Sequence, residues 1–180
     1  MHVNFDHFVK GIIMRTLLSL FIIILSSTTW AGSQSAEQAN IAPERIIKFA
    51  KNVERYAASK GARAFIIARI GRPKEDLPKG INYTHTAIAV YSNITLANGE
   101  SVPGYAIHNL YQVDGKLDKS KLVVDYPTDF FWGVNELKAG IIIPSQDIQN
   151  RLIKLIGDGG NAKLHNANYS VIANPFNSQL

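Results

Sequence analysis

The sequence predicts an α+β domain in which helices pack on a central antiparallel sheet. Two segments space their apolar residues as helices do, one near the start of the domain and one near its end. Between them lie several short segments that alternate in polarity or are rich in β-branched and aromatic residues, which is typical of strands. An Asn-Gly pair between two of these segments indicates a hairpin, and hence antiparallel neighbours.

Residues 1–31 have the features of a secretory signal peptide. The apolar run Leu17–Leu25 follows Lys10 and Arg15, and the small residues around Ala31 suit a signal peptidase. An apolar core of about nine residues is too short to span a bilayer. We therefore expect cleavage after Ala31, a periplasmic or secreted product, and no stable membrane anchor after cleavage. An uncleaved amino-terminal anchor is the alternative.

The rest of the chain divides into a flexible leader at residues 32–42 and a single domain at residues 43–180. Translation from Met14 in place of Met1 would shorten only the signal. The chain has no cysteine, so an exported product would have neither disulfides nor a lipid-anchor cysteine. Its net charge is +5, or +4 without the signal, which weakly favours anionic envelope polymers. The basic residues are scattered and form no recognition helix, which argues against a nucleic-acid partner.

The first two elements of the domain are predicted to be a helix and a buried strand. Pro43 opens the helix and Gly61 ends it. Its apolar residues follow helical spacing: Ile46, Phe49, Ala50, Val53 and Ala57. The segment Ala62–Ile70 alternates and has apolar residues on both faces, as a strand buried on both sides does.

Two further strands are predicted to form a hairpin. Gly71–Gly80 is a loop that contains two prolines, and Tyr83–Tyr91 is the second strand. Asn98-Gly99 is a hairpin signal before the third strand, Tyr105–Val113. The Val102-Pro103 pair suggests that the loop is wider than two residues.

The remainder of the domain is predicted to contain three more strands, a packed turn and a helix. Ser145 caps the helix, Gly157 ends it, and residues 158–160 form a turn. The packed turn is the aromatic segment Pro127–Gly133. The three strands are Leu122–Val124, Lys138–Ile143 and Tyr169–Ala173.

His85 is the strongest candidate for a catalytic residue. It lies near the start of a strand, and the small residues Ala87 and Ala89 follow on the same face, which leaves room beside an imidazole. An imidazole can serve as the base that activates a nucleophile. The alternative is a structural histidine that bonds a backbone carbonyl at the end of a strand.

His108 and Asn109, on the next strand, compete for the role of orienting His85. If the Asn98-Gly99 turn sets the register, paired residue numbers sum to an odd value, and His85 and His108 share a face. Asn109 then points to the opposite face. The alternative for His108 is a half-exposed strand histidine without a site role.

The remaining polar residues give weaker signals. His165 precedes the last predicted strand and is more typical of a solvated or structural histidine. The histidine spacing matches no metal motif, and no phosphate loop or dinucleotide fingerprint is present, so we expect no metal and no cofactor. The basic residues around the His85 strand are more typical of a solvated edge than of a binding rim: Arg63, Arg69, Arg72, Lys74 and Lys79.

Three segments together resemble one bacterial exported family, domain of unknown function 2145. They are Gly71–Gly80 leading into Thr84-His85-Thr86, the stretch Gly104–Gln112, and the carboxyl-terminal segment Tyr169–Leu180 with its Asn-Pro-Phe element. That family is similar to circularly permuted NlpC-type cell-wall amidases, which have a papain-like fold. The resemblance implies a papain-like domain in which the histidine strand comes first and the nucleophilic cysteine comes late.

The resemblance also implies a function, and this chain departs from the family pattern at the motif that carries the nucleophile. In the family a Gln-Asn-Cys motif follows the Asn-Pro-Phe element, and this chain ends before it, so the expected fold is incomplete at the carboxyl end. His85 takes the position of the base and His108 or Asn109 that of the orienting residue, with a peptidoglycan peptide or another envelope amide as substrate. The expected function is a thiol amidase or peptidase scaffold that is inactive as written. The alternatives are a non-catalytic envelope binding or interaction protein and the product of a decayed gene.

Overall fold

The computed structural model describes residues 38–114 and 116–168 of the chain. All of these residues belong to one compact unit. The predicted signal peptide, most of the predicted leader and the predicted last strand, Tyr169–Ala173, lie outside the described residues.

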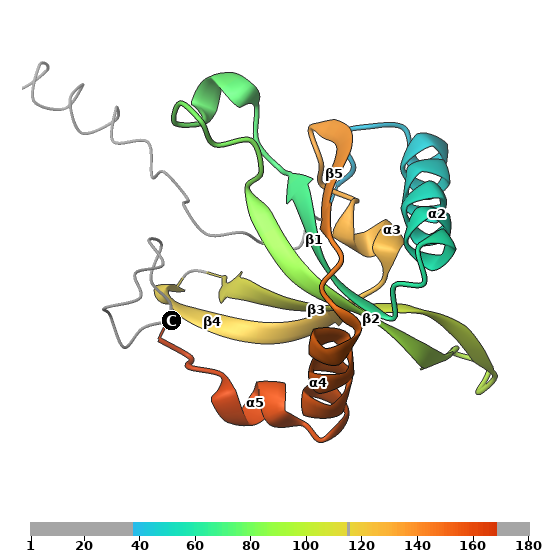
Figure 1. Cartoon of the computed structure of the whole chain (residues 1–180). Coiled ribbons are helices and arrows are strands. Elements are labelled where there is room, and N and C mark those ends of the chain that lie inside the picture. Colours follow the sequence, from blue (N-terminus) through green and yellow to red (C-terminus); the bar gives the residue numbers. More distant parts are fainter. Residues whose placement is uncertain (1–37, 115, 169–180) are drawn as a thin grey trace, which may run out of the picture. The chain divides into compact units, whose positions relative to one another are not determined.

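The centre of the domain is a five-stranded antiparallel sheet with the strand order β4-β3-β2-β1-β5 (Figure 1). After β4 the chain crosses to the opposite edge of the sheet, where β5 pairs with β1. This architecture confirms the predicted α+β class and the antiparallel sheet. The strands are β1 (Ala64–Ile70), β2 (His85–Thr95), β3 (Ser101–Val113), β4 (Lys116–Asp125) and β5 (Glu136–Ile142).

Helices lie on both faces of this sheet (Figure 1). The helices are α2 (Pro43–Ser59), α3 (Pro127–Phe130), α4 (Gln146–Gly157) and α5 (Gly160–Leu164), and a 3₁₀ turn, η1, covers Lys74–Asp76. We call the face under α2 and α3 the α2 face, and the face toward α4 and α5 the α4 face. No helix of residues 38–114 and 116–168 is long and apolar enough to cross a membrane.

The main core lies between α2, α3 and the α2 face of the sheet. The helix α2 starts at Pro43 and is followed by Gly61 with a φ of 64°, as its sequence predicts. Phe130 and Phe131 of the predicted aromatic turn are fully buried there, with their rings 5.1 Å apart. The turn is therefore a packed element of the core, and its backbone forms the short helix α3.

The helix α4 is attached to the start of β1 by a buried glutamine. Gln149 accepts hydrogen bonds from the backbone N–H groups of Arg63 and Ala64, at 2.8 and 3.2 Å, and donates to the Pro144 carbonyl at 3.0 Å. Ser145 caps α4 by accepting from the Ile148 N–H at 3.5 Å, as predicted. The helix ends at Gly157, but the left-handed residue that follows is Gly159, with a φ of 69°. The predicted turn at 158–160 therefore leads into α5, which the sequence did not predict.

The register of the β2–β3 hairpin differs from the prediction. Thr95 pairs with Ser101, and Leu96 donates to the Glu100 carbonyl at 2.7 Å, so the loop between them has three residues, 97–99. Gly99 adopts a φ of 85°, the left-handed conformation common at the end of a three-residue hairpin loop. Paired residue numbers therefore sum to an even value, as for Ile88 and His108.

This difference of one residue reverses every side chain of β3 relative to β2. The prediction that His85 and His108 share a face was wrong. His85 lies on the α2 face together with Asn109, and His108 lies on the α4 face.

Candidate functional site

Five polar side chains from four adjacent strands meet on the α2 face, next to α3. The register explains the meeting, because Arg69 pairs with His85 and Ile107 pairs with Asp125. Residues two apart on a strand share a face, which brings Asn109 and Tyr111 to the same region. We call the five residues the polar cluster: Arg69, His85, Asn109, Tyr111 and Asp125.

Hydrogen bonds link four members of the polar cluster into one continuous network. His85 Nε2 lies 2.9 Å from Asn109 Oδ1, and Asn109 Nδ2 donates to Asp125 Oδ2, also at 2.9 Å. The Tyr111 hydroxyl donates to the same Asp125 oxygen at 2.5 Å. Asn109 Nδ2 also faces the Ile107 carbonyl at 3.3 Å. Since both hydrogens of this amide face acceptors, its oxygen faces the ring, and His85 Nε2 is the donor.

Aromatic rings hold the imidazole of His85 in place. The ring stacks on Tyr111 at a centroid distance of 5.1 Å and an interplanar angle of 19°. Phe130 of α3 lies 5.9 Å away on a tilted plane. His85 is half-buried, so the imidazole is not sealed inside the core. With Nε2 used as a donor, the neutral ring presents Nδ1 as a proton acceptor.

The electrostatic environment keeps His85 neutral at pH 7. Burial lowers the pKa of His85 to about 4, the positive charge of Arg69 adds to this, and the bond to Asn109 opposes it. Arg69 is only 4% exposed, and its guanidinium lies over the rings of Phe130 and Tyr111, at 5.1 and 5.6 Å from their centroids. Arg69 also donates to the Phe130 carbonyl. The sequence prediction that Arg69 belongs to a solvated edge was therefore wrong.

The carboxyl group of Asp125 is buried beside this cation. Burial raises its pKa, whereas the hydrogen bond from Tyr111 and the charge of Arg69 act in the opposite direction. Burial likewise raises the pKa of the Tyr111 hydroxyl, which therefore remains a donor at neutral pH.

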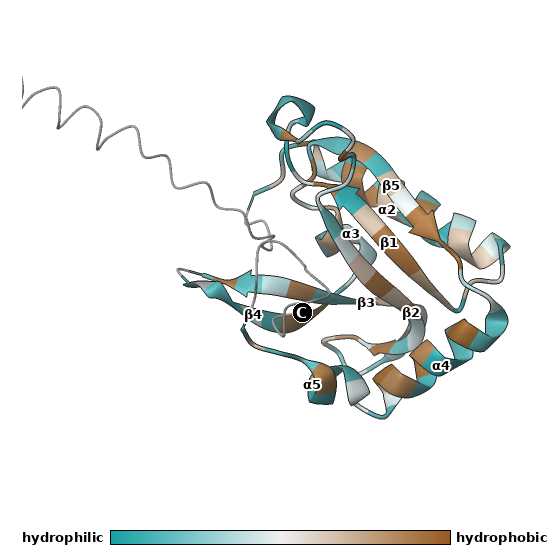
Figure 2. Cartoon of the chain, turned by 60° about the vertical axis from the view of Figure 1, so that its left-hand side comes forward, coloured by the Kyte–Doolittle hydropathy of each residue, from teal (hydrophilic) through white to brown (hydrophobic). Residues whose placement is uncertain are grey.

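His108 lies on the α4 face, away from the polar cluster. It lines a groove of about 380 Å³ between the sheet and the α4–α5 segment. Its Nδ1 is 3.5 Å from Asn161 Nδ2, and burial lowers its pKa. The other walls of the groove are mainly apolar, and α4 carries hydrophobic and hydrophilic patches along its length (Figure 2). The structure therefore brings Asn109, and not His108, to His85.

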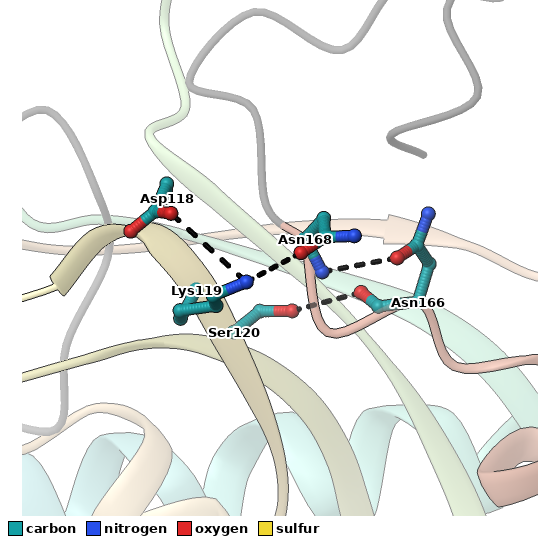
Figure 3. Close-up of polar contacts among 5 residues, drawn as sticks. All are labelled: Asp118, Lys119, Ser120, Asn166 and Asn168. Atoms are coloured by element: carbon teal, nitrogen blue, oxygen red, sulfur yellow. Dashed lines mark hydrogen bonds and ion pairs between the residues drawn. The ribbon is translucent and has the colours of Figure 1, made fainter.

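His165 takes part in the attachment of the last described residues to β4. Its Nε2 lies 3.0 Å from the Ser120 hydroxyl, which also donates to the Asn166 carbonyl at 3.1 Å. Figure 3 shows the neighbouring contact, in which Lys119 reaches Asn168. A structural role explains these contacts of His165. Among the described residues, no group of three or more His, Cys, Asp or Glu side chains is placed to hold a metal ion.

Sequence reasoning missed three members of the polar cluster: Arg69, Tyr111 and Asp125. A signal was present for two of them. Arg69 is a charged residue inside an otherwise apolar segment, and Asp125 directly follows the apolar segment Leu122–Val124. A charged residue at the end of a buried strand needs a partner, and this need could have linked the two.

Comparison with known proteins identifies a family for the chain. No curated protein and no solved structure matches it. The model of a family described as an uncharacterized protein conserved in bacteria, DUF2145, matches residues 56–180. That span includes β1 to β5 and every member of the polar cluster. The chain therefore belongs to the DUF2145 family of uncharacterized bacterial proteins.

Proposed function

We propose that the chain is an exported envelope protein whose sheet carries the base and the orienting residue of a thiol amidase or peptidase site. His85 is the base and Asn109 orients it. The observation that carries the proposal is the 2.9 Å contact between His85 Nε2 and Asn109 Oδ1, with Nδ1 left as the acceptor. The similarity to permuted NlpC-like, papain-fold amidases is part of this proposal.

The chemistry of a thiol hydrolase requires this arrangement. A thiol becomes a strong nucleophile only as the thiolate, so a neighbouring base must take its proton. An imidazole that is neutral at pH 7 can accept that proton at Nδ1, and a thiolate beside it would raise its pKa again. The sulfur would attack the amide carbonyl, the imidazolium would return the proton to the leaving amine, and water would hydrolyse the acyl-enzyme. The substrate class that we propose is a peptidoglycan peptide or a similar envelope amide.

Asn109 suits the orienting role better than His108 does. An amide that bonds the far nitrogen of the ring holds the imidazole in one tautomer and one orientation. His108 lies on the other face of the sheet and has no contact that could serve this purpose for His85.

The second candidate function is a non-catalytic envelope binding protein. The 180 residues contain no cysteine, and the groove on the α4 face combines apolar walls with a half-buried histidine. Ligand pockets commonly have this composition. Loss of peptide binding in His108→Ala, but not in His85→Ala, would favour this candidate.

Supplying a thiol tests the first candidate. We expect a chain extended beyond Leu180 by a Gln-Asn-Cys element and a helix-forming segment to have a thiol pKa at least about one unit below the ordinary value. The pKa is read from the pH dependence of alkylation by iodoacetamide. The 180-residue chain itself should catalyse no thiol-dependent hydrolysis.

Two variants of the extended chain provide the controls. His85→Ala should return the thiol pKa to its ordinary range, because the base is lost. His108→Ala removes a histidine of the adjacent strand from the opposite face and should leave the low pKa unchanged. An unperturbed thiol in the parent, or the same alkylation profile in His85→Ala, would rule out the proposed base.

Export is tested separately from chemistry. Expression of the full chain in a Gram-negative host should place the product in the periplasm, with Gly32 as its first residue in amino-terminal sequencing. A variant that lacks residues 2–31 should stay in the cytoplasm. A full-length product that remains in the cytoplasm would remove the envelope part of the proposal.

A further inference from the structure

We propose that Asp125 is the positioning residue that fixes the tautomer of His85, because it holds the Asn109 carboxamide in one orientation. The importance of this effect for catalysis rests on the proposed function. The effect on the ring depends only on the hydrogen bonds of the polar cluster.

Asp125 accepts hydrogen bonds within the polar cluster and donates none. Asp125 is 7% exposed, and one of its carboxylate oxygens receives both the Asn109 amide and the Tyr111 hydroxyl. An ionised carboxylate has no hydrogen to donate. Asn109 must therefore present its NH₂ group to Asp125.

The geometry of the Asn109 carboxamide then fixes the direction of its oxygen. With Nδ2 directed at Asp125, the second hydrogen of the amide faces the Ile107 carbonyl and Oδ1 faces the His85 ring. A flipped amide would place its Oδ1 against the Asp125 carboxylate, where that oxygen has no donor and Asp125 loses one of its two donors. The ring must then donate from Nε2, and the lone pair of the neutral imidazole is confined to Nδ1.

The orientation of the Asn109 carboxamide depends on the charge of Asp125. Arg69 of β1 supplies a buried positive charge, and Tyr111 of β3 supplies a second donor. Burial opposes the ionisation of Asp125 most strongly, and the nearby acid Asp129 of α3 adds to this. Arg69 and Tyr111 both favour the ionised form of Asp125. A neutral carboxamide at position 125 would therefore remove the preference of the Asn109 amide for one orientation.

The experiment measures the tautomer of His85 by two-bond ¹H–¹⁵N correlation NMR on the full ¹⁵N-labelled chain at pH 7. In the wild type, we expect the Nε2–H form to exceed the Nδ1–H form by more than about ten to one. In Asp125→Asn, the new carboxamide can donate as well as accept, so the ratio should fall to about one to one. Asp118→Asn, an exposed change of the same type on the same strand, should leave the ratio as it is in the wild type.

Two outcomes would overturn the inference. One is a wild-type ring that is mainly Nδ1–H or mixed, and the other is a folded Asp125→Asn variant with an unchanged ratio. Tyr111→Phe provides a further test that does not depend on the stability of Asp125→Asn. It keeps Asp125 and Asn109, so a mixed tautomer there would assign the role to Tyr111.

The NMR result and the thiol experiment fail independently. An ordinary thiol pKa together with a tautomer that depends on Asp125 would remove the proposed function and leave this inference. A lowered thiol pKa together with a tautomer that does not depend on residue 125 would remove this inference and leave the proposed function.

Discussion

Replacing Asp125 with alanine is expected to lower the free energy of unfolding by about 3 kcal/mol. The substitution leaves the Asn109 amide and the Tyr111 hydroxyl without their shared acceptor. It also removes a negative charge that favours the charged form of Arg69, a residue that is only 4% exposed. A buried donor or acceptor left unsatisfied costs about 1–3 kcal/mol. Urea unfolding followed by circular dichroism measures the loss, provided that the m value is unchanged.

Two further variants separate the buried charge from a general effect of substitution. Asp118→Ala, on the exposed surface of the same strand, should change the stability by less than about 0.5 kcal/mol. The double variant Arg69→Met, Asp125→Leu removes both charges and should recover part of the loss, because the buried cation that Asp125 attracts is removed as well. A loss below about 1 kcal/mol in Asp125→Ala would show that the polar cluster contributes little to folding.

Lowering the pH from 7 to 4.5 is expected to destabilise the domain by about 2 kcal/mol through His85 alone. The folded pKa of about 4 lies below the ordinary value of 6.5, so the unfolded chain binds more protons between these two values. The contribution of His85 is therefore fully present above pH 6.5 and is lost as the pH falls toward 4. Urea unfolding of the wild type and His85→Gln over this range measures the difference, and the variant should depend less on pH.

Other groups titrate in the same range and require matched comparisons. His108 also has a lowered pKa, so it contributes with the same sign, and His108→Gln measures its share. Asp125 has a raised pKa, so its contribution grows as the pH falls toward its ordinary value and partly offsets the loss. If His85→Gln remains as acid-sensitive as the wild type, the imidazole is not the buried neutral group described above.

Local patterns were sufficient to predict most elements of the fold. The helix that begins at Pro43, the strand buried on both faces and the helix capped by Ser145 follow from spacing and from capping residues. The strand β4 begins at Lys116, six residues before the apolar segment that predicted it. Its first half contains mostly charged and polar residues, so a search for apolar residues at strand spacing cannot reveal it.

Two of the five residues of the polar cluster were predicted from the sequence, but the pairing that brings them together was not. His85 and Asn109 were both candidates, but their shared face depends on whether the hairpin loop has two residues or three. The Asn-Gly pair is compatible with both lengths. The electrostatic attraction between Arg69 and Asp125 spans the four strands from β1 to β4. The distance between the two residues in the sequence does not indicate that they lie close together.

The register of the β2–β3 hairpin limits how the hairpin can change during evolution. A slip of one residue in the pairing of β2 with β3 would turn Asn109 toward the α4 face and bring His108 toward His85. A residue added within the loop can instead lengthen it and leave this pairing unchanged. Family members that retain the histidine–asparagine contact should therefore share the register of this hairpin, even where its loop differs in length.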